Sequence, residues 1–412
     1  ARVLPEKQRI DDRVAELFVP VILIISLLTF FIWVFFGGID VVSHGLFAAL
    51  SVLVVACPCV VGLATPVALA AGLNKAARNH ILIRDTSALE QMRNVDVVVF
   101  DKTGTLTEGH PTVIGWLWAQ GQEEHYKDVL LAAESTSDHP LAEAIVTALE
   151  GEEQVIPAHL DGFESIAGKG VRVAYQGAEY WVGSHKLLKD YQANLSDILA
   201  DMLTQYESDG NSIVYFGREN DLLAVIAIKD QLRVTSMEAI RELRIQDIEI
   251  CMLTGDGERT ASSVAGSLGI MRFVADAMPD DKEDFIHKLQ LQGKTVAMVG
   301  DGVNDARALS CADVSIAMGK GTDTLMDTAM ITLRTSDLLL LPKVFRLSRQ
   351  TVSLMYRNLF WAFIYNTVGI FVAAGVLYPV YDILLSPALA GAAMALSCVS
   401  VALSSLRLSS RF

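Results

Sequence analysis

The part of the sequence with the clearest chemical signature is Asp101 and the residues after it. Four apolar β-formers, Val97–Phe100, lead directly to Asp101, and Lys102, Thr103 and Gly104 follow. Such an unbroken apolar run predicts a buried strand of a parallel sheet. Open α/β sheets place ligands at the carboxyl ends of their strands, so we expect Asp101 to lie in a crevice. A carboxylate there can accept a phosphoryl group, although an Asp that merely ends a strand would give the same local pattern.

Two later motifs can hold phosphoryl oxygens at the same place. Thr254-Gly255-Asp256 follows the predicted strand Ile248–Leu253, and it offers a hydroxyl and a backbone N–H. Lys282, the last residue of the motif Pro279-x-x-Lys282, offers a point charge on a long side chain. Either motif alone could be an ordinary polar turn.

A third motif supplies a second acidic group. Gly300-Asp301-Gly302-Val303-Asn304-Asp305 follows the predicted strand Thr295–Val299. Asp301 and Asp101 then form a pair of hard oxygen ligands, which suits a Mg²⁺ ion that bridges to phosphate.

Two cysteines separated by a proline, Cys57-Pro58-Cys59, lie in a long apolar stretch. Proline removes a helix hydrogen bond and opens the backbone, so both thiols can face one cavity. Soft thiolates favour monovalent copper or silver, or zinc-like ions, over alkali and alkaline-earth ions. A further cysteine, Cys398, could add a third soft ligand or pack as a small apolar side chain.

The elements that position these residues divide into membrane and α/β parts. Hydrophobic residues make up 52% of the 412-residue chain and charged residues 20%, which is too apolar for an ordinary soluble protein. Basic residues follow the second and the last of four apolar stretches, so both termini and the α/β part are expected to be cytoplasmic in a multi-pass membrane protein. The four stretches, each expected to cross the bilayer, are Val14–Phe36, Val41–Ala71, Asn358–Leu377 and Leu385–Leu403.

Between the apolar ends, strands and helices alternate, with a region of different character inside. Asn74–Arg93 is expected to be helical, Leu223–Ile228 and Val314–Ala317 to be strands of the main sheet, and residues 378–382 to be the loop that joins the last two apolar stretches. The expected order is a linker (1–13), a first helix pair (14–73), the first part of an α/β domain (74–120), an inserted α+β domain (121–224), the second part of the α/β domain (225–340), and a second helix pair with a short tail (341–412).

Composition excludes other classes. The net charge of −15 gives no support to a nucleic-acid partner. Five unevenly spaced cysteines form no disulfide framework, which suits a reducing cytosol. The chain begins with Ala1 and nothing resembles a signal peptide, so we expect a fragment of a longer protein.

The run Asp101-Lys-Thr-Gly-Thr-Leu-Thr107, followed in order by the three motifs, resembles the phosphorylation signature of P-type ATPases. The resemblance implies four α-helical spans and a cytoplasmic, haloacid-dehalogenase-like α/β phosphorylation domain. Related phosphatases carry a general acid/base where this chain has Thr103, so the acyl phosphate should persist. Ala306-Arg307 departs from the usual pattern, away from the chemistry. The implied catalytic residues are Asp101, Lys102, Thr103, Thr254, Gly255, Asp256, Lys282 and Asn304, and the implied Mg²⁺ ligands are Asp101, Thr103 and Asp301.

Two segments of the inserted region resemble the nucleotide-binding signature of heavy-metal pumps. They are Glu134–Pro140 and Gly168-Lys-Gly170. A histidine can stack on adenine or hydrogen-bond to it, and glycines let the backbone approach a nucleotide. His139-Pro140 alone would equally mark a helix start, with Pro at the first position. The implied ATP-binding residues are Glu134, His139, Gly168 and Gly170.

In the membrane part the resemblance points to copper. Copper pumps of this family pair Tyr-Asn with Met-x-x-Ser-Ser, and this chain reads Tyr365-Asn366 and Met394-Ala-Leu-Ser-Cys398. Zinc and cadmium pumps carry a carboxylate in the last span, and Leu385–Leu403 has none. The implied ligands of the transported Cu⁺ are Cys57, Cys59, Tyr365, Asn366, Met394 and Cys398.

The whole pattern therefore predicts the catalytic half of an ATP-driven exporter of Cu⁺, or of Ag⁺, that uses Mg²⁺ and an aspartyl-phosphate intermediate. Its expected partners are the lipid bilayer, a copper chaperone, an actuator domain and upstream helices. The actuator motif Thr-Gly-Glu does not occur in the sequence, so the chain should phosphorylate itself without completing a cycle. The alternatives are a Zn²⁺ or Cd²⁺ pump, or a non-transporting regulatory fragment of such a pump.

Overall fold

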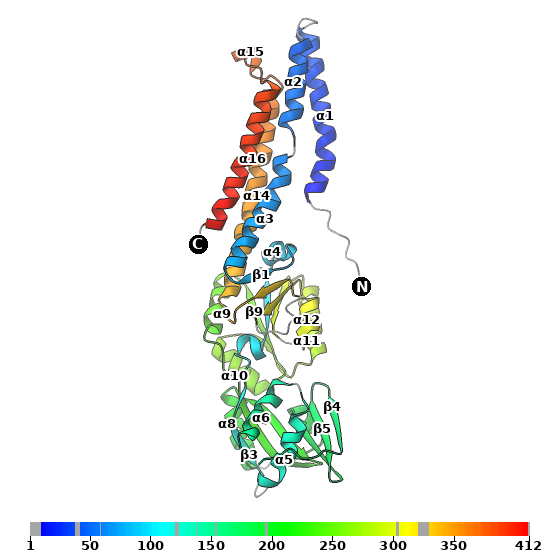
Figure 1. The fold of residues 1–412 in the computed structure, drawn as a ribbon, viewed down its shortest axis with the longest axis vertical. Coiled ribbons are helices and arrows are strands. Elements are labelled where there is room, and N and C mark those ends of the chain that lie inside the picture. Colours follow the sequence, from blue (N-terminus) through cyan, green and yellow to red (C-terminus); the bar gives the residue numbers. More distant parts are fainter. Residues whose placement is uncertain are drawn as a thin grey trace. The chain divides into compact units, whose positions relative to one another are not determined.

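The structure is a computed structural model of the chain, and it falls into two compact units. The first comprises residues 1–79 and 346–412 and is helical, and the second comprises residues 80–345 and combines strands with helices (Figure 1). The described residues are 10–37, 42–57, 59–119, 123–137, 139–152, 155–193, 197–301, 305–319 and 329–410.

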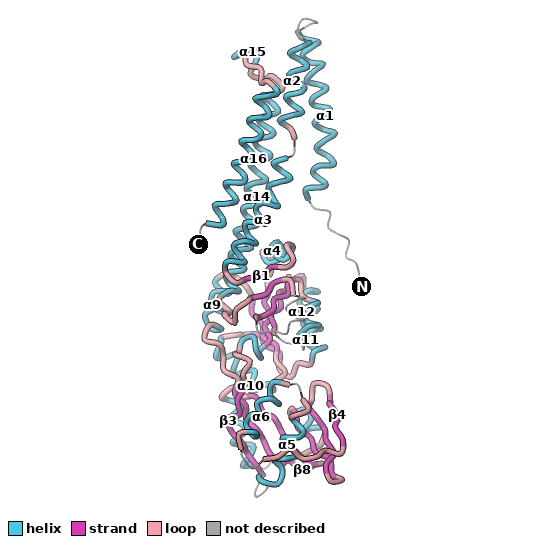
Figure 2. The backbone as a smooth tube through the Cα atoms, viewed as in Figure 1, coloured by secondary structure: helices cyan, strands magenta, loops and turns pink. Residues whose placement is uncertain are grey.

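Long helices build the first unit, because its sequence offers extended apolar runs with few charges (Figure 2). Small and β-branched residues pack where helices meet: Val60 and Ala64 contact Ala362 and Val401 in one cluster. The second apolar stretch is divided between a helix that ends at Val55 and one that begins at Cys59, as a proline in the sequence between them predicts. The helices are α1 (Ile10–Gly37), α2 (Val42–Val55), α3 (Cys59–Arg78), α14 (Leu340–Ala373), whose first residues belong to the second unit, the short α15 (Tyr378–Tyr381) and α16 (Pro387–Ser410).

Among the described residues, two helices are long and apolar enough to cross a membrane, over Val19–Phe36 and Pro387–Arg407. The prediction of four spans is therefore supported for the first and last stretches alone. The second stretch is divided between α2, which has 14 residues, and α3, which carries Lys75 and Arg78. The third stretch is the second half of the 34-residue α14, whose first half is basic.

The main sheet of the second unit is doubly wound, as the apolar strands predict. In the described part of the chain it has seven strands in the order β1-β13-β12-β11-β2-β9-β10, with β1 antiparallel and the others parallel. The predicted strands that end at Asp101, Leu253, Val299 and Ala317 are confirmed. The strands are β1 (Ile81–Ile83), β2 (Val97–Asp101), β9 (Glu249–Leu253), β10 (Arg272–Val274), β11 (Val296–Gly300), β12 (Val314–Met318) and β13 (Ile331–Leu333), and the helices are α4 (Ser87–Met92), α9 (Ser236–Ile245), α10 (Glu258–Leu268), α11 (Pro279–Leu291) and α12 (Ala306–Cys311).

A second, antiparallel sheet lies in the region inserted between β2 and β9. Its order is β3-β8-β7-β6-β5-β4, and α5 and α6 pack on it around the buried residues Leu130, Ile145 and Phe216 (Figure 1). Its elements are β3 (Thr112–Trp118), α5 (Glu123–Glu134), α6 (Pro140–Glu150), β4 (Gly162–Ile166), β5 (Gly170–Tyr175), β6 (Ala178–Gly183), α7 (His185–Asp190), α8 (Asp197–Ser208), β7 (Ser212–Arg218) and β8 (Asp221–Lys229).

Two sequence-based placements are wrong. Leu223–Ile228 was expected in the main sheet, but it is part of β8, which pairs with β3 and β7, and the expected boundary after residue 224 cuts through this strand. A wholly apolar run fits either sheet, so its composition could not decide. Asn74–Arg93 is not one helix: α3 ends at Arg78, His80 has a φ of 60°, and β1 and α4 follow. Pairing of β1 with the distant β13 overrides the local helical pattern.

Candidate active site

Asp101 and Lys282 form the centre of the site. Asp101 is the last residue of β2, between β9 and β11, and its side chain is buried. Lys282 Nζ, from the first turns of α11, lies 2.6 Å from Asp101 Oδ1 and 2.7 Å from Asp305 Oδ1. Burial lowers the pKa of Lys282, but the two carboxylates outweigh burial and raise it overall. Lys282 is therefore an ammonium group at neutral pH, and it holds one oxygen of each carboxylate.

Three carboxylates converge beside this lysine. Ligand oxygens of Asp101, Asp301 and Asp305 all lie within 4.8 Å of one another. Burial and the charge of Asp101 raise the pKa of Asp301 to about 7, and the same two causes raise the pKa of Asp305 to about 7 against the opposing effect of Lys282. Crowded, partly neutralised carboxyl oxygens of this kind suit a hard divalent cation. Asp305 was not assigned a role from the sequence, although it belongs to the recognised motif.

The Thr-Gly-Asp motif holds the lysine that follows Asp101. Asp256 forms an ion pair with Lys102, and Thr254 Oγ1 donates to Asp256 Oδ2 at 2.9 Å. Burial raises the pKa of Asp256, but Lys102 and hydrogen bonds outweigh it, so the net shift is downward. Gly255 forms the turn between these two side chains. Lys102 is thus directed at Asp256.

One residue of the inserted region reaches this pair and was missed by sequence reasoning. Ser212, the first residue of β7, donates to Asp256 Oδ1 at 2.7 Å and accepts from Lys102 Nζ at 3.1 Å. Nothing in the sequence around Ser212 signals this role, because the contact joins two sheets.

The loop after Asp101 is held by an aspartate and an arginine that follow β8. Asp230 accepts hydrogen bonds from Thr107 Oγ1 and, at 3.1 Å, from the backbone N–H of Gly109. Arg233 donates to the carbonyl oxygens of Gly104 and Thr105. Both residues were missed, since they lie more than 120 residues from the loop in sequence.

Gly104 allows the loop to approach the acidic cluster. It has a φ of +71°, and a Cβ atom there would lie 1.5 Å from Asp301 Oδ2. Thr103 precedes it in an extended conformation, and the hydroxyl of Thr105 is buried without a hydrogen-bond partner among the described residues. An unpaired buried hydroxyl at this point suits an oxygen-rich ligand. Asn304 lies outside the described residues.

The residues predicted to bind nucleotide lie in the inserted region. His139 begins α6, with its Nδ1 accepting from the N–H of Leu141 at 3.2 Å, so it does mark a helix start. Burial lowers the pKa of His139, and Asp256 and Lys102 also act on it, which puts the ring within electrostatic reach of the phosphorylation loop. Glu134 is buried at the end of α5, and burial raises its pKa to about 7.

The two predicted glycines have conformations that exclude side chains. Gly168 has a φ of +68°, and a Cβ there would lie 2.6 Å from the Cε of Met278, the residue before α11. Gly170 has a φ of +144°, and a Cβ there would lie 2.1 Å from the carbonyl oxygen of Val182. Gly168 therefore brings the inserted sheet against the helix that carries Lys282.

In the helical unit the two cysteines are joined. Cys57 and Cys59 form a disulfide with Cα atoms 5.5 Å apart, so the expectation of two free thiols is wrong in this structure. The Cys-Pro-Cys spacing brings the sulfur atoms together, as predicted, and in this structure they bond to one another. Binding of a soft metal by both sulfurs would require reduction of this bond.

The other predicted copper ligands differ in their surroundings. Asn366 on α14 is buried, and its Nδ2 has no hydrogen-bond partner among the described residues. Cys398 and Met394 on α16 are half-buried, and Cys398 packs against the cluster that contains Val60 and Ala64 of α3. Tyr365 is 45% exposed and stacks on Trp361, so the structure does not bring it to the buried face.

Residues 95–313, more than half of the chain, match the family model of the haloacid dehalogenase-like hydrolases. The chain belongs to this family. The matched residues include Asp101 at the end of β2 and the motifs that carry Asp256, Lys282 and Asp301.

Similarity to curated proteins extends beyond residues 95–313 to nearly the whole chain. A copper-exporting P-type ATPase of Legionella pneumophila is 42% identical over 97% of this chain and 54% of its own length. A silver-exporting P-type ATPase of Salmonella typhimurium is 44% identical over 98% of this chain and 49% of its own length. The chain thus spans about half the length of the curated relatives it matches.

A crystal structure of a zinc-transporting PIB-type ATPase in an E2·Pi state has a TM-score of 0.71 to this chain at 32% identity, covering 99% of this chain and 65% of that protein. The haloacid dehalogenase-like domain is therefore embedded in a chain that resembles the catalytic half of heavy-metal P-type ATPases. Together with the two long apolar helices, this likeness makes the chain a membrane protein.

Proposed function

We propose that the chain is the catalytic and metal-carrying portion of an ATP-driven exporter of monovalent copper or silver. The observation that carries the proposal is the hydrogen-bonded pair of Asp101 and Lys282 at the carboxyl end of β2, with Asp301 and Asp305 beside it. The named activities of the similar proteins, copper and silver export, support the choice of cargo.

In the proposed reaction Asp101 is the nucleophile. Lys282 holds Oδ1, so Oδ2 is the oxygen that attacks the γ-phosphorus of ATP. The bond from Oδ2 to phosphorus forms as the bond from phosphorus to the β–γ bridging oxygen breaks, and ADP leaves. Lys282 is placed to offset the charge that develops on the transferred phosphoryl oxygens. Because the aspartyl phosphate has Thr103 near it in place of an acid/base, it should hydrolyse slowly.

Mg²⁺ fits the acidic cluster. Asp101 and Asp301 would hold it, with the Asp305 oxygen within reach. Burial and the neighbouring charge of Asp101 raise the pKa of Asp301 and of Asp305, and a divalent cation would offset both effects. When bound, Mg²⁺ supplies positive charge between the carboxylates and phosphoryl oxygens. Thr103 is the remaining proposed ligand.

The inserted region is proposed to bind the nucleotide. Gly168 brings its backbone close to Met278, the residue before the helix of Lys282, and Gly170 lets the same loop pack against β6. The charges of Asp256 and Lys102 both act on His139. Glu134, kept largely neutral below pH 7 by burial, can donate as well as accept a hydrogen bond to a base. These four residues would hold ATP with its phosphates toward Asp101.

For transport, we propose that reduced Cys57 and Cys59 bind Cu⁺ or Ag⁺ at the junction of α2 and α3. Asn366, Met394 and Cys398 lie on half-buried or buried faces of α14 and α16 and are proposed to complete the site. Four membrane crossings, with both termini and the second unit in the cytoplasm, accompany this arrangement. A copper chaperone, an actuator domain and upstream helices are the proposed partners.

The competing function is export of Zn²⁺ or Cd²⁺, which the likeness to the zinc-transporting ATPase raises. The sequence of α16 opposes it, since this helix has no Asp or Glu to bind a divalent ion. The deciding experiment is acid-stable labelling by γ-³²P-ATP in the reduced chain, with Cu⁺, Ag⁺ or Zn²⁺. We expect Cu⁺ and Ag⁺ to change the labelled fraction and Zn²⁺ to leave it unchanged. Stimulation by Zn²⁺ alone would assign the chain to the zinc pumps.

A further inference from the structure

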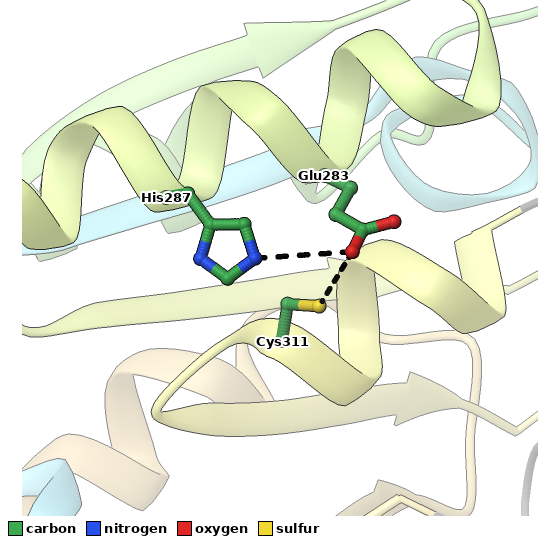
Figure 3. Close-up of side chains that lie close together, drawn as sticks. All are labelled: Glu283, His287 and Cys311. Carbon is green, nitrogen blue, oxygen red and sulfur yellow. Dashed lines mark hydrogen bonds and ion pairs between the residues drawn. The ribbon is translucent and has the colours of Figure 1, made fainter.

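A second group of metal-ligating side chains lies on α11 and α12, apart from the proposed site of phosphoryl transfer. Glu283 and His287 are one helical turn apart on α11, and Cys311 is the last residue of α12 (Figure 3). One ligand atom from each of the three side chains lies within 4.8 Å of the other two. From this geometry we propose that Glu283, His287 and Cys311 bind a single borderline divalent cation, for which Zn²⁺ is the natural probe.

The distances are close to those of a tetrahedral zinc site. Cys311 Sγ lies 3.4 Å from Glu283 Oε1, and His287 Nε2 lies 3.8 Å from the same oxygen. Zinc bonds are about 2.3 Å to sulfur and about 2.0 Å to nitrogen or oxygen. At tetrahedral angles they require about 3.5 Å between sulfur and oxygen and about 3.3 Å between nitrogen and oxygen. The sulfur and oxygen are already at this spacing. The histidine side chain is 51% exposed, so it can move the remaining few tenths of an ångström.

The surrounding hydrogen bonds orient the histidine for a metal. Gln290 Nε2 donates to the carbonyl of Cys311 at 2.9 Å, which turns Gln290 Oε1 toward His287 Nδ1 at 3.2 Å. An amide oxygen only accepts, so Nδ1 donates to Gln290 and Nε2 is the ring nitrogen left for a metal. Nε2 faces the Glu283 carboxylate, and a cation bound between the two would hold both groups. Metal-bound histidines usually make such a second hydrogen bond.

The carboxylate is oriented in the same manner. Arg307 Nη2 lies 2.9 Å from Glu283 Oε2, which leaves Oε1 toward the cysteine and the histidine (Figure 3). A thiolate, a carboxylate and a neutral imidazole would together cancel the charge of a divalent ion. One soft, one hard and one intermediate ligand suit Zn²⁺ better than Cu⁺, which prefers several soft ligands, or Mg²⁺, which prefers oxygen alone. Three protein ligands would leave the fourth position to water.

The two helices that carry these ligands also carry residues of the phosphorylation site. Lys282 directly precedes Glu283 on α11, and Asp305 directly precedes α12. An ion at the second site would link α11 to α12, in addition to the hydrogen bond that Lys282 donates to Asp305. The proposal does not depend on which ion the chain exports.

The test is Zn²⁺ titration of the reduced full chain against a chromogenic chelator. We expect the variants Cys311→Ser and His287→Asn each to bind one equivalent of Zn²⁺ fewer than the parent chain. Gln290→Leu, which removes the partner of His287 Nδ1, should lower the affinity for that equivalent of Zn²⁺ about tenfold. The matched control is His159→Asn, at an exposed histidine of the inserted region, which should match the parent.

A spectroscopic measurement separates this site from Cys57 and Cys59. In a full chain with both of those residues changed to Ser, Co²⁺ should give a thiolate charge-transfer band in the near ultraviolet. Adding Cys311→Ser should abolish the band. Equal Zn²⁺ stoichiometry in the parent, Cys311→Ser and His287→Asn, with no Cys311-dependent Co²⁺ band, would overturn the proposal and leave the cluster as an ion pair with a hydrogen-bonded thiol.

Discussion

Ser212 and Asp256 are joined by a 2.7 Å hydrogen bond between the inserted sheet and the main sheet. Ser212 also accepts a hydrogen bond from Lys102, the residue next to Asp101. The inserted sheet therefore contacts the phosphorylation loop directly through one hydroxyl. Movement of the inserted region away from the main sheet would release Lys102 and Asp256 from this third partner, which links nucleotide binding to the charge distribution beside Asp101.

Ser212→Ala tests this link. A hydrogen bond to a charged group contributes about 1.5–3 kcal/mol, so the variant should phosphorylate at least about tenfold more slowly if the bond persists in the reactive state. The measurement is the rate of ³²P labelling at saturating ATP. Ser263→Ala is the matched control, because Ser263 Oγ donates to the carbonyl of Ser208 between the same two regions but away from Asp101. Equal rates in both variants would limit the role of Ser212 to packing.

The nucleophile is tested by Asp101→Asn. The amide keeps the size of the side chain and removes the anion, so labelling from ATP should vanish while ATP still binds. The label is measured after acid quenching, and nucleotide binding by equilibrium dialysis. Asp201→Asn, at an exposed position of α8, is the control and should label like the parent. Persistent label on the Asn variant would place the phosphoryl group on another residue.

The role of Asp101 could be predicted from the sequence alone, and that of Ser212 could not. Asp101, Lys282 and Asp301 were predictable because each belongs to a short motif, and for Asp101 and Asp301 the motif follows an apolar strand. Ser212, Asp230 and Arg233 were not, since their contacts join segments more than 40 residues apart. The same limit affected β8, whose apolar sequence fits either sheet, and β1, which forms by pairing with the distant β13. The orientation of Tyr365 depends on packing of whole helices, which a local motif does not contain.

Gly168→Ala tests the approach of the inserted sheet to α11. The new Cβ would lie 2.6 Å from the Cε of Met278, so either the methionine or the glycine loop must shift, and labelling by low ATP concentrations should fall. Gly177→Ala is a close control, because Gly177 also has a positive φ, of +76°, but has open space around it. Both variants bear the backbone strain of about 1 kcal/mol, and Gly168→Ala alone bears the clash. Indistinguishable apparent affinities for ATP would contradict the assigned role.

Glu134→Gln should alter the dependence of stability on pH. The pKa of Glu134 is about 7 in the folded chain against an ordinary value of 4.5, so between these pH values the folded state binds more protons than the unfolded state. Its contribution to stability is present below pH 4.5 and is lost as the pH rises through about 7, where the buried carboxylate ionises.

The amide of Glu134→Gln cannot ionise. The free energy of unfolding of the variant, relative to that of the parent, should therefore rise by up to about 3 kcal/mol between pH 5 and pH 8. Thermal unfolding of the full chain at the two pH values gives the measurement. The control is Glu150→Gln, at an exposed residue ending α6, whose melting temperature should follow the parent at both pH values. If the melting temperatures of Glu134→Gln and the parent differ by the same amount at both pH values, Glu134 is already charged in the folded chain.

Cys398 offers the sharpest test of the proposed metal site. It is half-buried and packs against the cluster that contains Val60 and Ala64 of α3, the helix that begins at Cys59, so it lies on a partly covered face of α16. A thiol there can join Cys57 and Cys59 as a third soft ligand for Cu⁺ once their disulfide is reduced. We therefore expect Cys398→Ser to lower the affinity for Cu⁺ by at least about tenfold, and Cys398→Ala to lower it at least as much, since a hydroxyl is a weak ligand for this ion.

The measurement is competition with a Cu⁺ chelator under reducing conditions, with ATP binding as a check on folding. Cys251→Ala, in the buried strand β9, is the control for loss of a thiol elsewhere and should bind Cu⁺ like the parent. If Cys398 merely packs in this apolar cluster, Cys398→Ala will bind Cu⁺ as tightly as the parent, because a small apolar side chain takes the place of the thiol. That result would leave a site of two cysteines, with Asn366 and Met394 as the remaining candidates.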